Sequence, residues 1–362
     1  MLLGAEPNPP YDRPPLSKEF LRGEVGPADI ALRDEGWAEQ HGVRVESSSP
    51  VVGLDPRERG IRIADGRRIG FERCLLATGA RPATIDLPGA ESGERVAGLR
   101  TPADSLRAAS WAEPGARILV VGSGFIGCEA AVSLAMRGAA VTLLSTERLP
   151  QVDRLGEDVA GLLAGWLEGD GVELRGGSSL EAIESPASGE LPLRVHSSAA
   201  EPIDCDAVLL ALGITRNTEL ASEAGLAVGT GILTDASMRA SAPGIWAAGD
   251  VAEAKNATFG DRVLVEHWGE ALEQGAVAGA AMAGAEERWT SVPGFWSMIG
   301  ERTLKFCGWG GDYDEADLDA GQDGFSVAYR RGGRLVGVLA HERDEAYERG
   351  QDQVASDARA NA

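Results

Sequence analysis

The sequence has no closely spaced cysteines. Its cysteines stand at positions 74, 128, 205 and 307, and they form neither a C-x-x-C pair nor any other short spacing. This pattern excludes a redox dithiol relay and a metal site built from neighbouring residues, so we expect no bound metal. Four small buried residues in a reducing cytoplasm are the simpler interpretation.

Long apolar segments and an excess of positive charge are also absent. The longest run of small residues, 275–285, is too short to cross a bilayer, and no secretory signal precedes an apolar stretch. The net charge of −22 argues against unspecific binding to nucleic acid or to an anionic membrane. We therefore expect a soluble cytoplasmic protein, monomer or homodimer, with no nucleic-acid or membrane partner.

Lysine is scarce, because it occurs only at positions 18, 255 and 305 among 34 basic residues. Lys18 follows a loop in which Pro14 and Pro15 fix the backbone, and Ser17 is expected to cap a helix that starts near it. A lysine presented by a rigid loop is a candidate site residue. The alternative interpretation is a solvated lysine on a surface turn.

The stretch 117–129, RILVVGSGFIGCE, is the most informative motif in the chain. An apolar run over 118–121 is typical of a buried parallel strand, and a helix over 128–136 and a second strand over 140–144 follow. Three glycines at G-x-G-x-x-G spacing separate the first strand from the helix. This order predicts a dinucleotide-binding turn.

Each glycine of this turn has its own physical reason. Gly122 permits the tight turn, Gly124 lets the backbone approach a pyrophosphate, and Gly127 lets the helix pack closely on the strand. The free N–H groups at the helix start would then bind the anion.

The residues after the second strand bear on the choice between NAD and NADP. An acidic side chain at this place binds the ribose 2′-hydroxyl of NAD, and here the strand is followed by Ser145, Thr146, Glu147 and Arg148. Glu147 is placed to reach the ribose, whereas Ser145 with Arg148 would tolerate a 2′-phosphate. We favour NADH and keep NADPH as the alternative.

The remaining patterns predict an α/β protein with two Rossmann-like domains and a C-terminal α+β domain. The segments CLLATGARP (74–82) and AVLLALG (207–213) are each an apolar strand that ends in a glycine turn, so each is expected to close a nucleotide-binding domain. The expected domains are residues 1–98 with 227–290, residues 99–226, and residues 291–362.

Three local predictions complete this scheme. The pieces VRVES, GIRIAD and GRRIG between 42 and 70 predict a small antiparallel meander rich in arginine. Gly332 and Gly333 predict a hairpin turn between two strands within 325–339, and residues 347–362 are expected to form a polar end. Asp250 follows a buried strand at 245–247, which is the usual ligand-binding edge of an α/β sheet.

Six motifs, in this order, resemble the FAD-dependent ferredoxin reductase family over essentially the whole chain: PYDRPPLSKEFLRG, LLATGARP, the glycine loop, GIWAAGDV, EHWGEALEQG and PGFWS. The resemblance implies that FAD lies between the first domain and the helix after Trp268. It further implies that NADH passes a hydride to the flavin, and that single electrons then go to a ferredoxin-type iron–sulfur protein.

The same resemblance implies the site residues. Lys18 and Glu129 would form the catalytic pair beside flavin N5, where the lysine charge stabilises the reduced flavin. Trp268 and Trp296 would flank the flavin and the nicotinamide. The cofactor-binding residues implied are Glu6, Arg13, Lys18, Thr78, Gly79, Gly122, Gly124, Gly127, Glu129, Glu147, Gly213, Gly249, Asp250, Glu266, His267, Trp268 and Trp296.

The resemblance departs from the family at the N-terminus. The family begins with a strand, a further G-x-G-x-x-G turn and a helix that bind the ADP half of FAD, a unit of roughly 30 residues. This chain starts at about the second strand, LLGAE, whose acidic end is Glu6. Either the start was assigned too far downstream or the protein is a truncation that binds FAD poorly. We favour the first, because the residues around the reactive end of the flavin still match.

Two other functions stay open. One is a soluble flavin NADH oxidase or quinone reductase, and the other is a non-catalytic NAD-binding protein that has lost FAD. An acidic ferredoxin would need a basic docking face on this acidic chain. Two regions offer one: residues 57–73, and Arg330, Arg331 and Arg334.

Overall fold

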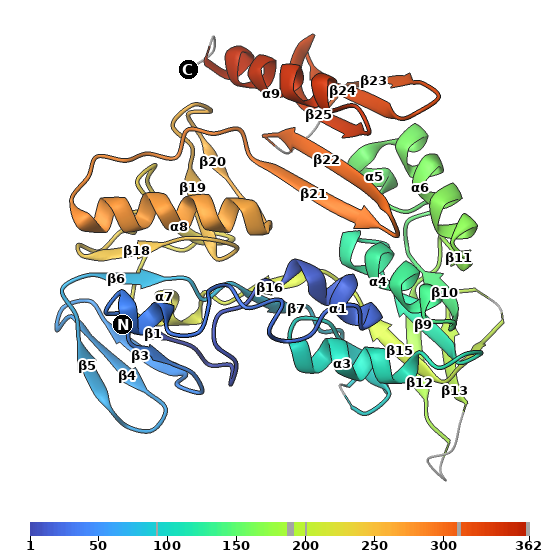
Figure 1. Cartoon of the computed structure of the whole chain (residues 1–362), viewed down its shortest axis with the longest axis horizontal. Coiled ribbons are helices and arrows are strands. Elements are labelled where there is room, and N and C mark those ends of the chain that lie inside the picture. Colours follow the sequence, from blue (N-terminus) through green and yellow to red (C-terminus); the bar gives the residue numbers. More distant parts are fainter. Residues whose placement is uncertain (92, 187–191, 200, 310–312, 360–362) are drawn as a thin grey trace.

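The structure, a computed structural model, describes residues 1–91, 93–186, 192–199, 201–309 and 313–359. A five-stranded parallel sheet with helices packed against it occupies one side of the molecule, and it confirms the predicted α/β class (Figure 1). In spatial order its strands are β11 (Val172–Arg175), β10 (Ala140–Leu144), β9 (Arg117–Val121), β15 (Ala207–Leu210) and β8 (Val96–Gly98). The helices in contact with these strands are α3 (Pro102–Trp111), α4 (Phe125–Met136) and α6 (Glu157–Gly169).

The glycine loop joins β9 to α4, as the sequence predicts. β9 is buried from Ile118 to Val121, and α4 is buried over most of its length, because its small and apolar side chains pack against the sheet. α3 begins at a capping box in which Thr101 Oγ1 accepts a hydrogen bond from Asp104 N and the Asp104 carboxylate accepts one from Thr101 N. These termini fix where the loop meets its neighbours.

A small antiparallel sheet lies beside the parallel one. Leu180, Val195 and Cys205 share a buried apolar cluster with Leu119 and Val208 of the parallel sheet. The strands are β12 (Leu180–Glu184), β13 (Leu193–Ser197) and β14 (Ile203–Cys205), and the short helix α5 (Val152–Leu155) precedes α6.

The first and later parts of the chain form four small sheets. Two are parallel pairs: β1 (Leu2–Leu3) with β2 (Val45–Glu46), and β6 (Cys74–Leu76) with β18 (Ile245–Ala247). The other two are the meander of β3 (Val51–Asp55), β4 (Gly60–Ile63) and β5 (Arg68–Gly70), and the sheet of β17 (Ile232–Thr234), β19 (Ala252–Lys255) and β20 (Arg262–Val263). The helices of this part are α2 (Trp37–Gln40), α7 (Glu219–Glu223) and α8 (Trp268–Ala283).

The predicted meander is wrong in one strand. The piece VRVES supplies β2, which pairs in parallel with β1, and the first strand of the meander is β3 instead. Asp55 explains the difference, because its carboxylate accepts hydrogen bonds from the N–H groups of Arg57 and Glu58 and so closes the turn from β3 into β4.

The N-terminal loop packs against the parallel-sheet unit. It contains the 3-10 helix η1 (Pro14–Ser17) and helix α1 (Glu19–Arg22), drawn in blue beside α3 and α4 in Figure 1. Leu21 is fully buried in the core of that unit. The predicted helix cap is wrong, because Ser17 makes no capping bond and its hydroxyl is directed at Glu129.

Two short strands connect the two parts of the molecule. β7 (Ala80–Pro82) leads toward β8, and β16 (Ile214–Arg216) returns from β15. They pair antiparallel with each other, so the chain enters and leaves the parallel-sheet unit at one place.

The C-terminal residues form a five-stranded antiparallel sheet with its two faces in different cores. Phe325, Val327 and Leu339 pack with α6 and the parallel-sheet unit, whereas Leu335 and Val338 pack with the α8 side. In spatial order the strands are β21 (Gly294–Ile299), β22 (Arg302–Gly308), β25 (Arg334–His341), β24 (Phe325–Arg331) and β23 (Glu315–Ala320). The predicted hairpin turn at Gly332 and Gly333 is confirmed, since it joins β24 to β25.

The segment predicted as a polar end is polar, and its described part forms a helix. Helix α9 spans Asp344–Arg359, and residues 360–362 lie outside the described part of the chain. Tyr347, Gly350 and Val354 form one apolar stripe at helical spacing, and this stripe packs on β25. A single stripe in a polar sequence was too weak a signal to predict the helix.

No helix in the described ranges has both the length and the apolar composition that a bilayer crossing requires. Likewise, the residues with described positions contain no group of three or more potential metal ligands.

Candidate functional site

A single large cavity brings most of the predicted site residues together. Its volume is about 2810 Å³, and it extends from the N-terminal residues past the glycine loop to the C-terminal sheet. Of the predicted residues, Gly122 is not part of the lining. The residues that do line the cavity are Glu6, Arg13, Lys18, Thr78, Gly79, Gly124, Gly127, Glu129, Glu147, Gly213, Gly249, Asp250, Glu266, His267, Trp268 and Trp296.

The three loop glycines have different surroundings. Gly122 has a φ of +107°, and a Cβ there would lie 2.2 Å from Ala211 O. A Cβ on Gly127 would lie 2.0 Å from Gly122 O, so neither position admits a larger residue without a shift of the backbone. Gly124 faces the cavity, and the atom nearest to its Cβ position is Gln151 Nε2 at 3.9 Å. Of the three, only Gly124 therefore has room for a Cβ.

Glu147 lies beside this loop. Its Oε2 accepts a hydrogen bond from Ser123 Oγ at 2.8 Å, and Ser123 Oγ is also 2.6 Å from Ser145 Oγ. Arg148 forms an ion pair with Glu157 at the exposed surface. The acidic side chain thus faces the nucleotide loop and the cavity, whereas the basic one points elsewhere.

The Glu129 carboxylate is buried and accepts four hydrogen bonds. Ser17 Oγ at 2.5 Å and Lys18 Nζ at 3.1 Å donate to Oε2, while Ser297 Oγ at 2.7 Å and Met298 N at 3.1 Å donate to Oε1. The two members of the predicted catalytic pair are therefore in direct contact, although 111 residues separate them in sequence. The N-terminal loop, α4 and β21 meet at this one carboxylate.

Trp296 and His267 stand next to that pair. Lys18 Nζ lies 5.0 Å from the centre of the Trp296 ring, a cation–π distance. His267 Nδ1 accepts a hydrogen bond from Gly269 N at the start of α8, and its Nε2 lies 3.2 Å from Trp296 O. Burial lowers the pKa of His267, and its Nε2 lies 3.2 Å from Trp296 N as well as from Trp296 O.

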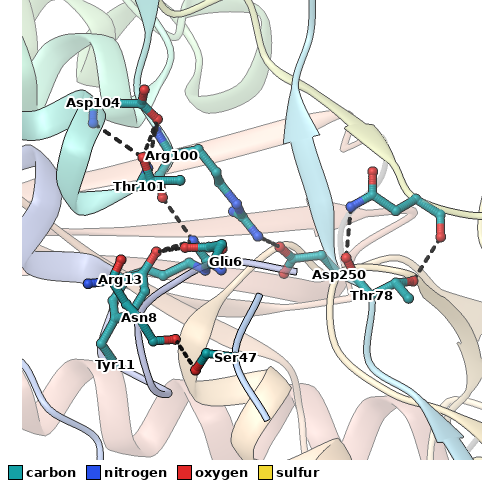
Figure 2. Close-up of polar contacts among 11 residues, drawn as sticks. Glu6, Asn8, Tyr11, Arg13, Ser47, Thr78, Arg100, Thr101, Asp104 and Asp250 are labelled. Atoms are coloured by element: carbon teal, nitrogen blue, oxygen red, sulfur yellow. Dashed lines mark hydrogen bonds and ion pairs between the residues drawn. The ribbon is translucent and has the colours of Figure 1, made fainter. Parts of the chain in front are cut away.

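Glu6 and Arg13 contact each other at the N-terminal end of the cavity (Figure 2). Arg13 Nη2 donates to Glu6 Oε1 at 2.6 Å, and Tyr11 Oη donates to Glu6 Oε2 at 2.5 Å. Arg13 Nη1 reaches both Tyr11 Oη at 2.7 Å and Arg100 O at 2.9 Å. This network lines the cavity with charged and hydroxyl groups.

Two arginines that the sequence did not single out contact Asp250. Arg100 Nη2 donates to Asp250 Oδ2 at 3.3 Å, and Arg216 Nε donates to Asp250 O at 2.9 Å. Arg216 also forms an ion pair with Glu266. Their position in the sequence could have pointed to them, because each arginine lies near a segment where the chain passes between the two parts of the molecule. Figure 2 shows the Arg100 side chain extended toward Asp250.

The other predicted residues shape the cavity wall through the backbone. Thr78 Oγ1 donates to Asn217 O at 2.8 Å, and Asn217 Nδ2 donates to Thr78 O at 2.7 Å. Gly79 and Gly213 have φ values of +59° and +90°, which favour glycine.

Helix α8 is fixed to this wall at two points. Gly249 N donates to Gln274 Oε1 at 2.9 Å, and Trp268 Nε1 donates to Asp12 Oδ1 at 3.0 Å. The indole of Trp268 is therefore held at the edge of the cavity by the N-terminal loop.

Glu270 is a buried carboxyl behind this site. Its Oε1 accepts a hydrogen bond from Gly294 N at 3.1 Å at the start of β21, the strand that carries Trp296 and Ser297. Burial raises the pKa of Glu270 to about 7 from the ordinary value of 4.5, and Glu273 adds to the rise. The folded state therefore binds this proton more tightly than the unfolded chain.

We expect the free energy of unfolding to fall as the pH rises from 4.5 to about 7, because Glu270 must lose its proton in a buried place. Glu270→Gln keeps the acceptor for Gly294 N and removes this titration. Above pH 7 the variant should be more stable than the parent by about 3 kcal/mol. Urea unfolding over a pH series measures the effect, with Glu286→Gln, an exposed glutamate of the same region, as the control. If the free energies of unfolding of the parent and Glu270→Gln differed by the same amount at every pH, the expectation would be contradicted.

Comparison with known proteins identifies the family. Residues 1–275 match the family described as pyridine nucleotide-disulphide oxidoreductase. The chain belongs to this family. Its members are oxidoreductases that use FAD and NAD(P)H, which confirms the predicted flavoprotein class and cofactors. The four cysteines are all free here, so the disulphide chemistry of the family name has no counterpart in a cysteine pair of this chain.

Individual relatives agree with the resemblance seen in the sequence. A probable ferredoxin reductase of Castellaniella defragrans is 33% identical over 93% of this chain and 83% of the relative. Rhodocoxin reductase of Rhodococcus erythropolis is 30% identical over 93% of this chain and 79% of the relative. The crystal structure of a covalent putidaredoxin reductase–putidaredoxin complex is 27% identical with a TM-score of 0.92, and the match covers 98% of this chain and 86% of that chain.

Proposed function

We propose that this protein is an NADH-dependent FAD reductase that passes electrons to a ferredoxin-type iron–sulfur protein. One observation carries the proposal: a single cavity joins the nucleotide loop at Gly124 to the buried pair Lys18 and Glu129. A nicotinamide and a flavin could meet only in such a shared space. Relatives named as ferredoxin and rubredoxin reductases support this assignment.

The hydrogen-bonding capacity of the pair fits a flavin. Lys18 Nζ carries three N–H groups, and in the described part of the chain Glu129 is its one hydrogen-bond partner. Glu129 already accepts four hydrogen bonds, so its oxygens are satisfied. The pair therefore offers donors and no acceptor to the cavity. That chemistry suits a group that gains negative charge on reduction.

When bound, FAD supplies the redox chemistry, because it takes a hydride from NADH and gives up electrons singly. The chain itself needs no general base for this reaction. Lys18 provides positive charge at the reactive end, and Trp296 and Trp268 provide flat surfaces that orient rings and exclude water. His267 fixes the backbone of Trp296.

The FAD site in this proposal is formed by residues 1–98 and 227–290, together with Arg100 and Gly213 at the edge of residues 99–226. Arg13 and Arg100 offer positive charge to the phosphates, and Asp250 offers acceptors to the ribityl hydroxyls. Glu6 belongs to the adenosine end. The other proposed FAD contacts are Thr78, Gly79, Gly213, Gly249, Glu266, His267, Trp268 and Trp296.

The NAD site in this proposal is formed by residues 99–226, while residues 291–362 form the C-terminal reductase domain. Gly122, Gly124 and Gly127 place the backbone N–H groups of the α4 start against the pyrophosphate. Glu147 binds the ribose hydroxyls. The contact of Glu147 with Ser123 on the loop supports NADH over NADPH.

Glu147→Gln should lower the affinity for NADH about tenfold and leave NADPH binding less affected, because a charged acceptor for the ribose is lost. Arg148→Gln is the matched comparison, since Arg148 pairs with Glu157 and is not in the cavity lining. It should leave NADH binding unchanged. Titration of the purified protein with both nucleotides measures the ratio. An unchanged ratio in Glu147→Gln would place the ribose elsewhere.

A docking face for an acidic carrier is expected at the β24–β25 hairpin. Arg331 and Arg334 flank its turn, are exposed, and have no ion pair within the described ranges. Val336 and Gly337 of the same hairpin line the cavity, so this face adjoins the cavity that would hold the flavin. The chain as a whole has a net charge of −22, which would repel an acidic partner without such a basic face.

Arg331→Glu combined with Arg334→Glu should therefore slow carrier reduction about tenfold at low salt, while ferricyanide reduction stays unchanged. The same reversal at Arg59 and Arg68 of the meander is the matched control for net charge. Equal loss in both assays would exclude docking at the hairpin. A loss confined to the meander variant would move the docking face there.

The proposal as a whole is tested by the absorption spectrum of the purified chain. A tightly bound oxidised flavin that is bleached by NADH under anaerobic conditions would support it, and carrier-dependent cytochrome reduction would complete it. Rapid oxygen uptake without a carrier would favour the NADH oxidase alternative. A colourless protein that binds NAD and takes up no added FAD would overturn the proposal in favour of a non-catalytic NAD-binding role.

We further propose a cytoplasmic location and a monomeric or homodimeric state. Four free cysteines support a reducing compartment. Sedimentation at several protein concentrations would decide the oligomeric state.

A further inference from the structure

The serines around Glu129 are closer to it than the lysine is. Ser17 Oγ lies 2.5 Å and Ser297 Oγ 2.7 Å from a carboxylate oxygen, whereas Lys18 Nζ lies at 3.1 Å. Both hydroxyl distances are in the range of charge-assisted O–H···O⁻ hydrogen bonds. The Lys18–Glu129 ion pair is therefore longer than either serine–Glu129 hydrogen bond.

The two serines come from separate elements. Ser17 ends η1 in the N-terminal loop, and Ser297 lies in β21 directly after Trp296. They bind opposite oxygens of the carboxylate, one on Oε2 and one on Oε1. Their contacts span 112 and 168 residues, and all atoms involved are buried.

Because the site is buried, these hydrogen bonds influence where the positive charge of Lys18 lies. In a low-dielectric place a carboxylate attracts every donor strongly, and each donor that it binds lowers its pull on the others. Without the serine hydroxyls, Lys18 would be the strongest remaining donor. Its ammonium would then move toward Glu129 and away from the cavity.

We propose that Ser17 and Ser297 are positioning residues that satisfy the Glu129 carboxylate and so keep the Lys18 ammonium directed into the cavity. This inference rests on the proposed function, because the group that would gain from the ammonium is the reduced flavin. The serines hold no proton or electron of the reaction. They determine how close the positive charge of Lys18 lies to the reacting groups.

Ser297→Ala should weaken the binding of reduced relative to oxidised flavin about tenfold, which makes the midpoint potential about 30 mV more negative for a two-electron couple. Ser297→Thr keeps a hydroxyl and should restore the parent potential. Ser133→Ala is the matched control, because Ser133 is a buried α4 serine whose hydroxyl donates to Ser17 O and not to Glu129. A dye-coupled reductive titration measures all four proteins.

A second readout needs no cofactor. The chain has lysines only at 18, 255 and 305, so reductive methylation followed by mass spectrometry reports Lys18 against the exposed Lys255. In Ser17→Ala and Ser297→Ala, Lys18 should react several-fold more slowly relative to Lys255, because its ammonium is drawn onto Glu129. Ser133→Ala should react like the parent.

The two readouts separate this inference from the function. A protein without flavin would contradict the proposed function, and the methylation ratio would then decide the positioning role alone. An unchanged or faster Lys18 reaction in both alanine variants would overturn the inference. So would a potential in Ser297→Ala that equals those of the parent and the threonine variant.

Discussion

Lys18→Met should slow flavin reduction by NADH by about two orders of magnitude, comparable with the loss of one preorganised charge-stabilising donor. Methionine keeps the length and apolar stem of the lysine and removes only the ammonium. Glu129 would keep three donors, from Ser17, Ser297 and Met298, so the carboxylate stays satisfied. The expected loss is therefore in the chemistry rather than in the fold.

A double variant tests whether the ammonium itself acts. Lys18→Met with Glu129→Gln restores local neutrality, and it should be as slow as Lys18→Met alone if the positive charge is the active feature. Recovery of the rate would instead mean that the single variant suffers from an unpaired buried carboxylate. Rapid-mixing absorbance under anaerobic conditions measures each rate, and Lys255→Met serves as the control for loss of one surface lysine.

The parts of the fold that were predictable depend on local sequence patterns. The strand at 140–144 and the strand at 245–247 were predicted at their observed bounds, because continuous apolar runs between glycine turns leave few alternatives. The hairpin at Gly332 and Gly333 follows from the same kind of local rule. The dinucleotide-binding turn combines the glycine spacing with the apolar periodicity of its strand and helix, and it was the most reliably predicted element.

Predictions from local sequence patterns failed where a side chain binds a partner that is distant in the sequence. Ser17 was expected to cap a helix, yet its hydroxyl binds Glu129, a residue 112 positions later. A serine hydroxyl in a short loop can donate to a buried carboxylate nearby, and this charged acceptor gives a stronger hydrogen bond than a neutral one. Arg216 was missed for a similar reason, since its partners Asp250 and Glu266 lie 34 and 50 residues away.

Gly124→Val should abolish NADH binding while the chain still folds. Gly124 has a φ of −63° and ψ of 171°, which valine adopts readily, and its Cβ position meets only open cavity out to Gln151 Nε2 at 3.9 Å. The valine methyl groups would occupy the space where a pyrophosphate approaches the backbone. We expect the affinity for NADH to fall by at least about two orders of magnitude, since the main anion contact is blocked.

Gly127→Ala provides the contrast that makes this prediction specific. Its Cβ would lie 2.0 Å from Gly122 O, so the loop or α4 must shift, and the chain should lose about 3 kcal/mol of stability. The two variants therefore separate binding from folding: the first should lose NADH with a parent-like unfolding curve, the second should unfold more easily. Calorimetric titration with NADH and urea unfolding measure the pair. If Gly124→Val bound NADH normally, the glycine loop would have only a structural role, and NADH would have to bind at another part of the cavity.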